Sequence, residues 1–228
     1  MNSHFFNTGI YTVPDAARLT GVSAGRIRRW LRGYRYTSRE KTYESPALWH
    51  GQWEPIDQSL ALGFLDLIEI RFVDAFLQAG VTWTMLRRAR EKAHAMFKVS
   101  HPFCTHHFMT DGREIFVELH RETGEASLVE IVRRQQVFAQ IVKPFLKELE
   151  FEEQSGVIRW WPLGDNRLVV LDPTRNFGRP IVSSHGVPTE ALARAVKSSG
   201  SITEVTRWFE VAEREVRDAV EYEQRLAA

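Results

Sequence analysis

The sequence contains a single cysteine, Cys104, among 228 residues. One cysteine excludes a disulfide within the chain and is typical of reducing compartments, so we expect a cytoplasmic protein. The sequence also lacks an apolar run of about 18 residues, the length that a membrane-spanning helix needs. Its first twelve residues contain neither a basic segment nor a long apolar stretch, so they predict no secretory signal.

Motifs of the common enzyme classes are missing as well. The sequence has no phosphate-binding P-loop, no Gly-x-Ser-x-Gly elbow and no dinucleotide-binding glycine pattern. Asp66 and Glu69 fall on the predicted polar side of one helix, where solvation explains them, and Asp111 and Glu114 belong to a predicted hairpin. We therefore expect a protein that is not an enzyme and that binds no cofactor.

A metal site is not expected either. The histidines and the cysteine that gather between residues 101 and 107 do not have the spacing of a zinc knuckle. His106 and His107 would also point to opposite faces of the strand that we predict there.

The net charge of +1 conceals an uneven distribution of charge. Residues 1–53 contain eight Lys or Arg and three Asp or Glu, whereas residues 54–153 contain 12 and 16, and residues 154–228 contain ten of each. A basic first segment on an acidic middle suits a protein that contacts nucleic acid through one end.

The basic segment is organised around residues 11–36, which predict two short helices joined by a tight turn. Thr12 and Asp15 have the spacing of a capping box, and Gly21 suits the left-handed residue that ends the first helix. Ser23 is placed to cap the second helix, on which Ile27, Trp30, Leu31 and Tyr34 recur at helical spacing and should face inward.

Such a helix pair suits DNA, because the second helix can enter a major groove while its arginines neutralise phosphates and recognise guanine edges. The alternative is a solvated basic helix on another kind of small domain. Residues 37–52 follow where a winged fold has its basic hairpin, although they also suit a plain surface loop. The predicted DNA-binding residues are Ser23, Arg26, Arg28, Arg29, Arg32, Arg35, Arg39 and Lys41.

Further along, apolar spacing predicts a helix over residues 59–79 and another over 82–97, with Arg87, Arg88, Arg90 and Lys92 on the solvent side of the second. Strands are predicted at 106–109 and 114–119 around the Asp111-Gly112 turn. A helix over 128–149, a hairpin over 151–161 and a strand at 167–171 follow. From residue 172, turn residues and then three short helices are predicted, starting near Pro188, Ser201 and Glu213.

The predicted helix pair resembles a known DNA-binding family. Val22-Ser23, Ile27-Arg28 and the aromatic Trp30 resemble the start of a MerR-type winged helix-turn-helix, a family in which an arginine matching Arg28 contacts the DNA backbone. The sequence departs from that pattern at Arg29, where an aromatic residue is usual, and at Leu31, where an acid is usual.

The last 55 residues or so resemble a small antitoxin-associated domain. The resemblance rests on Gly178-Arg179-Pro180-Ile181, Gly186-Val187-Pro188-Thr189, Gly200-Ser201, Val205 and residues 216–220. The whole arrangement resembles long VapB-type antitoxins of PIN-toxin systems. It implies an α+β fold with a winged helix-turn-helix (residues 1–55), a mixed helix and hairpin middle (56–171) and a C-terminal three-helix domain (172–228).

The same resemblance implies a dimeric DNA-binding antitoxin that represses its own operon and neutralises a PIN-domain ribonuclease. An arginine would suit the acidic, Mg²⁺-binding site of such a toxin, and Arg175, Phe177 and Arg179 are the predicted toxin contacts, unless they only brace their loop.

Other functions remain open. A plain regulator could use Phe97, Phe103, Phe108, Phe116 and Trp160 to line a small-molecule pocket, although core packing explains these side chains more simply. A protein-interaction module without DNA binding is a third class. The final three helices could contact DNA, but their mixed charges favour packing or dimer contact.

Overall fold

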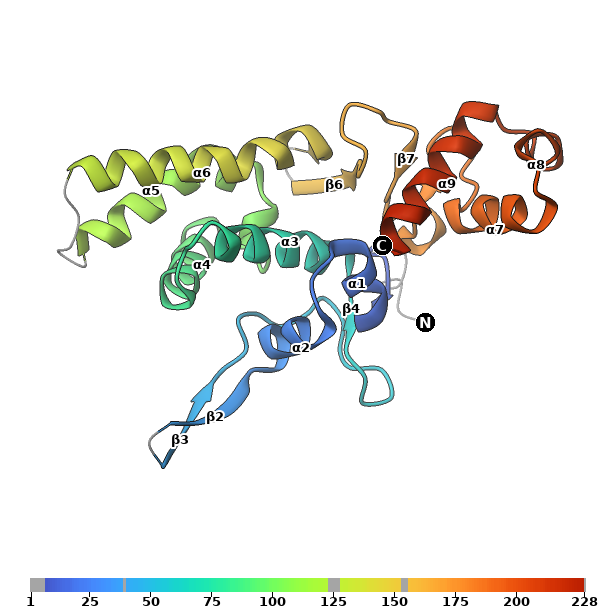
Figure 1. Ribbon diagram of the computed structural model, residues 1–228. Helices are drawn as coiled ribbons and strands as arrows, with labels where there is room; N and C mark the ends of the chain where they lie inside the picture. The colour runs from blue at the N-terminus through green and yellow to red at the C-terminus, as the bar shows by residue number, and fades with distance from the viewer. Residues whose placement is uncertain (1–6, 39, 123–127, 153–155, 228) are drawn as a thin grey trace. The chain divides into compact units, whose positions relative to one another are not determined.

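The chain is a mixed α+β protein, as the sequence predicts, and Figure 1 shows its elements in a computed structural model. The structure describes residues 7–38, 40–122, 128–152 and 156–227. Its helices there are α1 (Val13–Thr20), α2 (Ala24–Arg32), α3 (Phe64–Gln78), α4 (Trp83–Phe97), α5 (His106–Glu122), α6 (Leu128–Glu148), α7 (Thr189–Ser199), α8 (Ile202–Phe209) and α9 (Glu213–Ala227), with the 3₁₀ turns η2 (Pro102–Cys104) and η3 (Asn176–Gly178). None of these helices is both long enough and apolar enough to cross a membrane.

The strands are short and pair antiparallel, two by two. They are β1 (Tyr11–Thr12) with β4 (Ala61–Leu62), β2 (Tyr34–Ser38) with β3 (Lys41–Ser45), β5 (Leu149–Glu152) with β6 (Gly156–Trp160), and β7 (Val169–Val170) with β8 (Ile181–Val182). The chain forms two compact units, each with its own core. We call the described part of residues 11–144 with Gly156 the N-terminal unit, and the described parts of 7–10, 145–152 and 157–227 the C-terminal unit.

Helix α1 begins and ends as the sequence predicts. The Thr12 side chain accepts a hydrogen bond from the Asp15 backbone N–H (3.2 Å), and the Asp15 carboxylate accepts one from the Thr12 N–H (3.0 Å). This capping box satisfies two backbone groups that the first turn would otherwise leave without a partner. Gly21 ends the helix with φ 74°, a left-handed conformation that costs glycine little.

Replacing Thr12 with Ala is expected to lower the free energy of unfolding by about 1 kcal/mol, because the N-cap hydrogen bond is lost. Urea unfolding followed by circular dichroism would measure the change. The matched control is Thr203→Ala at an exposed position inside α8, where alanine favours the helix and stability should not fall. Equal losses in the two variants would contradict the assigned role of the cap.

Helix α2 is shorter than predicted. Ile27, Trp30 and Leu31 are buried as expected, but the prediction for Tyr34 is wrong, because it lies on strand β2 and is 36% exposed. The helix stops at Gly33, whose φ of 73° leaves the helical region. A side chain at Gly33 would place its Cβ 2.5 Å from the Ser45 carbonyl oxygen, so the base of the β2–β3 hairpin requires glycine.

The hairpin predicted around Asp111-Gly112 is wrong, because α5 runs through both residues as one helix. A Cβ on Gly112 would lie 2.8 Å from the Phe108 ring and 2.9 Å from the Phe138 ring of α6. The glycine therefore serves close packing of two helices and not a turn.

Aromatic side chains fill the core of the N-terminal unit. The Phe76 ring centroid lies 5.1 Å from that of Phe116 and 5.8 Å from that of Phe103, and Phe103 and Phe108 are 4.4 Å apart. Phe103, Phe108 and Phe116 are buried here and Trp160 is buried in the C-terminal unit, so packing accounts for four of the five aromatic residues that could have lined a ligand pocket. Phe97 stacks on His107 with centroids 5.9 Å apart.

The prediction that Asp66 lies on a polar, solvated face is wrong, because its side chain is fully buried. Its carboxylate accepts hydrogen bonds from Trp49 Nε1 (2.8 Å) and from the backbone N–H groups of Gln52 (2.9 Å) and Gly63 (2.8 Å). His101 Nε2 lies 2.8 Å from the same carboxylate. Asp66 thus joins the start of α3 to two segments far away in the sequence.

Glu69 and Arg90 form a second buried polar centre, and the predicted solvent exposure of both is wrong. Arg90 Nε donates to the Glu69 carboxylate (2.8 Å), and its other nitrogens donate to the carbonyl oxygens of Leu48 (3.2 Å) and Ser100. Burial raises the pKa of Glu69, although Arg90 opposes the shift. Burial also raises the pKa of Cys104, whose Sγ lies 3.5 Å from Glu69 Oε2.

The C-terminal unit contains the β5–β6 hairpin and the three final helices that the sequence predicts. Gly200 ends α7 in the left-handed region, the Ser201 hydroxyl caps α8, and Val216 and Ala219 of α9 are buried. Trp160 and Trp161 are both buried.

Arg159 of β6 links strand β5 to the segment after β7 by donating to Glu150 (2.9 Å) and Asp172 (2.8 Å). Burial alone would raise the pKa of Asp172, but the hydrogen bonds from Arg159 and Thr174 outweigh it and lower that pKa. The ion pair therefore stabilises the fold above the pKa of an unfolded aspartate, and this stabilisation is lost as the pH falls through the lower pKa of folded Asp172.

Candidate nucleic-acid interface

The outward face of α2 carries a compact group of arginines. Arg28, Arg29 and Arg32 are all exposed, and their spacing of three and four residues places them on one side of the helix. The opposite side carries the buried Ile27 and Leu31, so the arginine side faces solvent. The helix thus presents its positive charge away from the core.

Gly25 lies in the first turn of α2 and shares this outward face. No atom lies within 4 Å of the position that a Cβ would occupy there, so packing against the protein does not require glycine. Glycine inside a helix costs about 1 kcal/mol relative to alanine, yet it allows another molecule to approach the backbone closely. Sequence reasoning missed this residue, and a glycine on the polar side of a basic helix is the signal that could have identified it.

Two of the predicted DNA-binding arginines also hold α2 in place. The Arg26 guanidinium lies 2.6 Å from the Asp74 carboxylate of α3 and 4.9 Å from the centre of the Trp30 ring. Arg32 donates to the Gln58 carbonyl oxygen (2.7 Å). Arg26 is only partly exposed, so bracing explains it at least as well as contact with a ligand.

Ser23 is exposed at the position that precedes α2, as predicted, but its side chain makes no capping hydrogen bond there. The Ser23 hydroxyl therefore accepts no hydrogen bond from the backbone N–H groups in the first turn of α2. N-terminal residues of a recognition helix are the ones that reach base edges in helix-turn-helix proteins.

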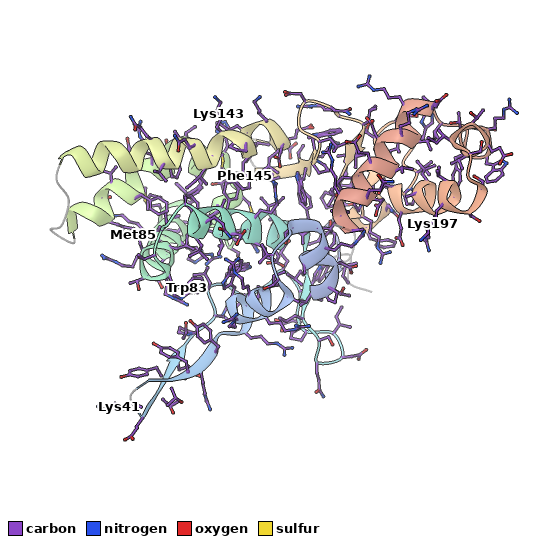
Figure 2. All side chains as sticks on the ribbon, viewed as in Figure 1. Lys41, Trp83, Met85, Lys143, Phe145 and Lys197 are labelled. Carbon is purple, nitrogen blue, oxygen red and sulfur yellow. The ribbon has the colours of Figure 1, made fainter. Side chains whose placement is uncertain are left out.

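The β2–β3 hairpin continues directly from α2 and extends away from it (Figure 1). The structure confirms a hairpin in the region predicted for it, residues 37–52, although the first strand begins earlier, at Tyr34. Figure 2 shows Lys41 at the far end of the hairpin. Arg35 is exposed and lies 3.5 Å from Glu44 on the neighbouring strand, whereas Arg39 lies outside the described residues.

The base of the hairpin is fixed to α4. Arg87 donates to the carbonyl oxygens of Pro46 (2.7 Å) and Ala47 (3.0 Å), and its guanidinium lies 5.5 Å from the centre of the Trp83 ring. Lys92 of the same helix pairs with Glu118 at 2.6 Å. Arg87 and Lys92 of α4 therefore serve the fold through these contacts.

The structure gives no support to a metal site within the residues it describes, where no group of three or more His, Cys, Asp or Glu side chains is placed to hold an ion. His101 and Cys104 are instead engaged by Asp66 and Glu69.

Phe177 lies in the 3₁₀ turn η3, and Arg175 and Arg179 flank that turn. Arg175 donates to the Ser183 carbonyl oxygen (2.8 Å), which is a bracing role, whereas Arg179 is exposed. Phe177 is 61% exposed although it has a positive φ of 54°, and its carbonyl oxygen accepts a hydrogen bond from the Ile10 N–H (3.1 Å). Positive φ is uncommon for a residue other than glycine, and the exposed ring is accessible to another molecule.

The solvent face of α9 differs from that of α2. Arg217 pairs with Glu213 at 2.5 Å, and Arg225 pairs with Glu221 in the same way further along the helix. Acidic and basic groups thus neutralise each other within the helix, which supports packing or protein contact over phosphate binding for this element.

No protein-family model matches the chain, but comparison with known proteins shows similarity over nearly its whole length. The chain is 26% identical to the protein named "Putative antitoxin VapB45" from Mycobacterium tuberculosis, over 95% of this chain and 94% of that protein. The crystal structure of Rv2018 from Mycobacterium tuberculosis matches 94% of this chain and 98% of its own, with a TM-score of 0.71 and 22% identity. The second similarity shows that the two chains share a fold.

Proposed function

We propose that this chain is a DNA-binding antitoxin that represses its own operon and neutralises a PIN-domain ribonuclease toxin by direct binding. The similarity to a protein named as an antitoxin, along nearly the full length of both chains, carries this proposal. In this proposal, residues 1–55 bind the operator, residues 56–171 connect the two ends, and residues 172–228 form the antitoxin-associated domain.

The outward face of α2 supports the DNA-binding half of the proposal. Arg28 and Arg29 are exposed, and Gly25 leaves room for a phosphate or a base edge beside them. Arginine neutralises phosphates and also forms bidentate hydrogen bonds with guanine. A homodimer would place two copies of this face on an inverted repeat, with half-sites about 10 base pairs apart or a multiple of that.

The turn η3 supports the toxin-binding half. Phe177 exposes a large aromatic surface and Arg179 is exposed two residues later, and both residue types are enriched at protein interfaces. The active site of a PIN-domain ribonuclease holds clustered acidic groups, and a guanidinium pairs with carboxylates through two parallel hydrogen bonds. We propose that Phe177 anchors the toxin and that Arg179 approaches its acidic site, with Arg175 holding the turn.

The test is co-expression of the full chain with a PIN-domain protein encoded by a neighbouring gene. We expect the two to co-purify as a tight complex in which ribonuclease activity is suppressed. The double variant Phe177→Ser with Arg179→Ala should weaken the complex by at least about a hundredfold, because an anchor residue and a charge-assisted contact are lost together. Isothermal titration calorimetry would measure the affinity.

Arg194→Ala provides the matched control, since Arg194 is an exposed arginine of α7 in the same unit and lies 3.5 Å from Glu190 of its own helix. Toxin affinity of this variant should equal that of the unchanged chain. If the two proteins fail to associate at all, the antitoxin half of the proposal is wrong. If they associate but the η3 variant binds normally, the toxin contact lies elsewhere.

A further inference from the structure

Helix α9 carries a regular row of charges on its solvent side. Exposed acidic and basic side chains alternate every four residues along it, in the order Glu213, Arg217, Glu221 and Arg225. Residues four apart form a ridge on a helix surface, so these four side chains make one ridge about 18 Å long. Val216 on the other side of α9 is buried, so the ridge faces away from the core. We call these four side chains the charge row.

Ion pairs within the helix explain only part of the charge row. Arg217 lies 2.5 Å from Glu213, and Arg225 pairs with Glu221. All four side chains nevertheless stay more than half exposed, so each can take a second partner. The net charge of the row is zero, so it attracts neither a phosphate backbone nor the acidic site of a toxin.

The order of the charges is complementary to itself in one orientation. We consider a second copy of α9 that runs antiparallel, with the two-fold axis at the level of Ala219. Glu213 then faces Arg225 of the second copy, and Arg217 faces Glu221 of the second copy. Symmetry repeats both contacts, so every charge of the row meets an opposite charge. Parallel helices in register would instead place each charge opposite a like charge.

An exposed tryptophan lies at one end of the charge row. Trp208 of α8 is 61% exposed, although tryptophan side chains are buried to a large extent in most proteins. Val205 of α8 packs into the same core as Val216 of α9, and Trp208 lies one turn further along, toward the start of α9. In the antiparallel pair, Trp208 is therefore placed near the end of α9 in the second copy, where Leu226 is only partly buried.

From these observations we propose that the charge row and Trp208 form the surface through which two copies of the chain associate, with their α9 helices antiparallel. This inference rests on the homodimer of the proposed function and identifies the surface that forms it. Complementary charges determine the orientation of a protein contact. Exposed ion pairs add little affinity, and a tryptophan supplies the apolar anchor that they lack.

The dimer is expected to be weak. One helix face and one indole from each copy cover less than the roughly 800 Å² that a standard interface takes from each partner. Salt also screens ion pairs at a surface. Sedimentation velocity of the full chain should therefore show a reversible dimer whose dissociation constant is micromolar and rises with salt concentration.

The experiment changes the signs in the charge row. Glu213→Arg with Glu221→Arg gives an all-basic row, the basic variant, and Arg217→Glu with Arg225→Glu gives an all-acidic row, the acidic variant. Each variant alone should dimerise at least about tenfold more weakly than the unchanged chain, because like charges then face each other. An equal mixture of the two should form a heterodimer at least as tight as the natural dimer, which native mass spectrometry identifies by its mass.

The matched control exchanges all four charges at once. Glu213→Arg, Arg217→Glu, Glu221→Arg and Arg225→Glu together reverse every sign, and the reversed row is again complementary to itself. We expect this variant to dimerise like the unchanged chain. Circular dichroism of every variant would verify that α9 remains helical.

The contribution of Trp208 has its own variant. Trp208→Ala should raise the dissociation constant of the dimer at least about tenfold without changing its dependence on salt, because an apolar anchor is lost and no charge is removed. Leu146→Ala is the control, since Leu146 is a 52% exposed apolar side chain of the same unit and should not affect the dimer. Normal dimerisation of the Trp208 variant would overturn its assignment as the anchor.

The outcomes distinguish this inference from the proposed function. Natural dimerisation of the basic variant, a mixture that does not pair, or a monomeric fourfold exchange would each show that the homodimer uses another surface. If the unchanged chain is monomeric at every concentration, the homodimer of the proposed function is wrong and this inference fails with it. DNA binding and toxin binding are tested by their own titrations.

Discussion

Replacing Arg28 and Arg29 together with alanine is expected to weaken binding to duplex DNA about a hundredfold. Both side chains are exposed on the outward face of α2, and alanine suits an exposed helical position, so folding should be unaffected. Each arginine that neutralises one phosphate contributes about 0.9 to the slope of log affinity against log salt, so the slope should fall by about 1.8. Anisotropy titrations at several salt concentrations would measure both quantities.

A loss of net charge could weaken DNA binding without any specific contact, so the control must remove the same charge. Arg194→Ala with Lys197→Ala does so in the C-terminal unit, where both basic side chains are exposed on α7. We expect this variant to bind DNA almost normally. If it loses as much affinity as the α2 variant, the DNA site is not on α2.

The second large effect concerns the buried carboxylate of Asp66. Replacing Asp66 with Asn is expected to lower the free energy of unfolding by about 3–5 kcal/mol, the usual cost of breaking a buried charged network. An asparagine amide has one acceptor oxygen, and its NH₂ group would face some of the N–H donors that now point at the carboxylate. Native domains are stable by only about 5–15 kcal/mol, so much of the population would unfold under mild denaturant.

The control for this prediction lies two turns further along α3. Asp74 pairs with Arg26 at 2.6 Å but its side chain is 24% exposed, so Asp74→Asn should cost no more than about 1 kcal/mol. Urea unfolding of both variants, followed by circular dichroism, would separate the two positions. Equal losses of unfolding free energy in the two variants would contradict the prediction, because the buried Asp66 would then stabilise the fold no more than the partly exposed Asp74.

Local sequence signals predicted those elements whose ends are determined by neighbouring residues. The Thr12–Asp15 capping box and the left-handed Gly21 both act within four residues, and the structure confirms each. The helix predicted to start near Ser201 is confirmed as well. The same reasoning failed at Asp111-Gly112, because the glycine there packs against Phe138 of another helix. A turn signal and a close helix contact both favour glycine, and the sequence alone does not distinguish them.

In the candidate site, too, sequence reasoning predicted what depends on neighbouring residues and failed where distant residues decide. Helical spacing correctly placed Arg28, Arg29 and Arg32 on an exposed face. It could not show that Arg90 would be buried beside Glu69, because that partner lies 21 residues away in the sequence. Acids three residues apart on an apolar helix, such as those at 66 and 69, are the pattern that could have indicated buried partners.

The burial of Cys104 has a practical consequence for spectroscopy. Its thiol is 2% exposed, and burial raises its pKa well above the usual range, so the reactive thiolate is scarce at neutral pH. The natural chain therefore behaves as a background without a reactive cysteine. A cysteine introduced at the exposed Thr42 would accept a single maleimide dye, which would report directly on the hairpin as DNA is added, with no need to remove the native thiol.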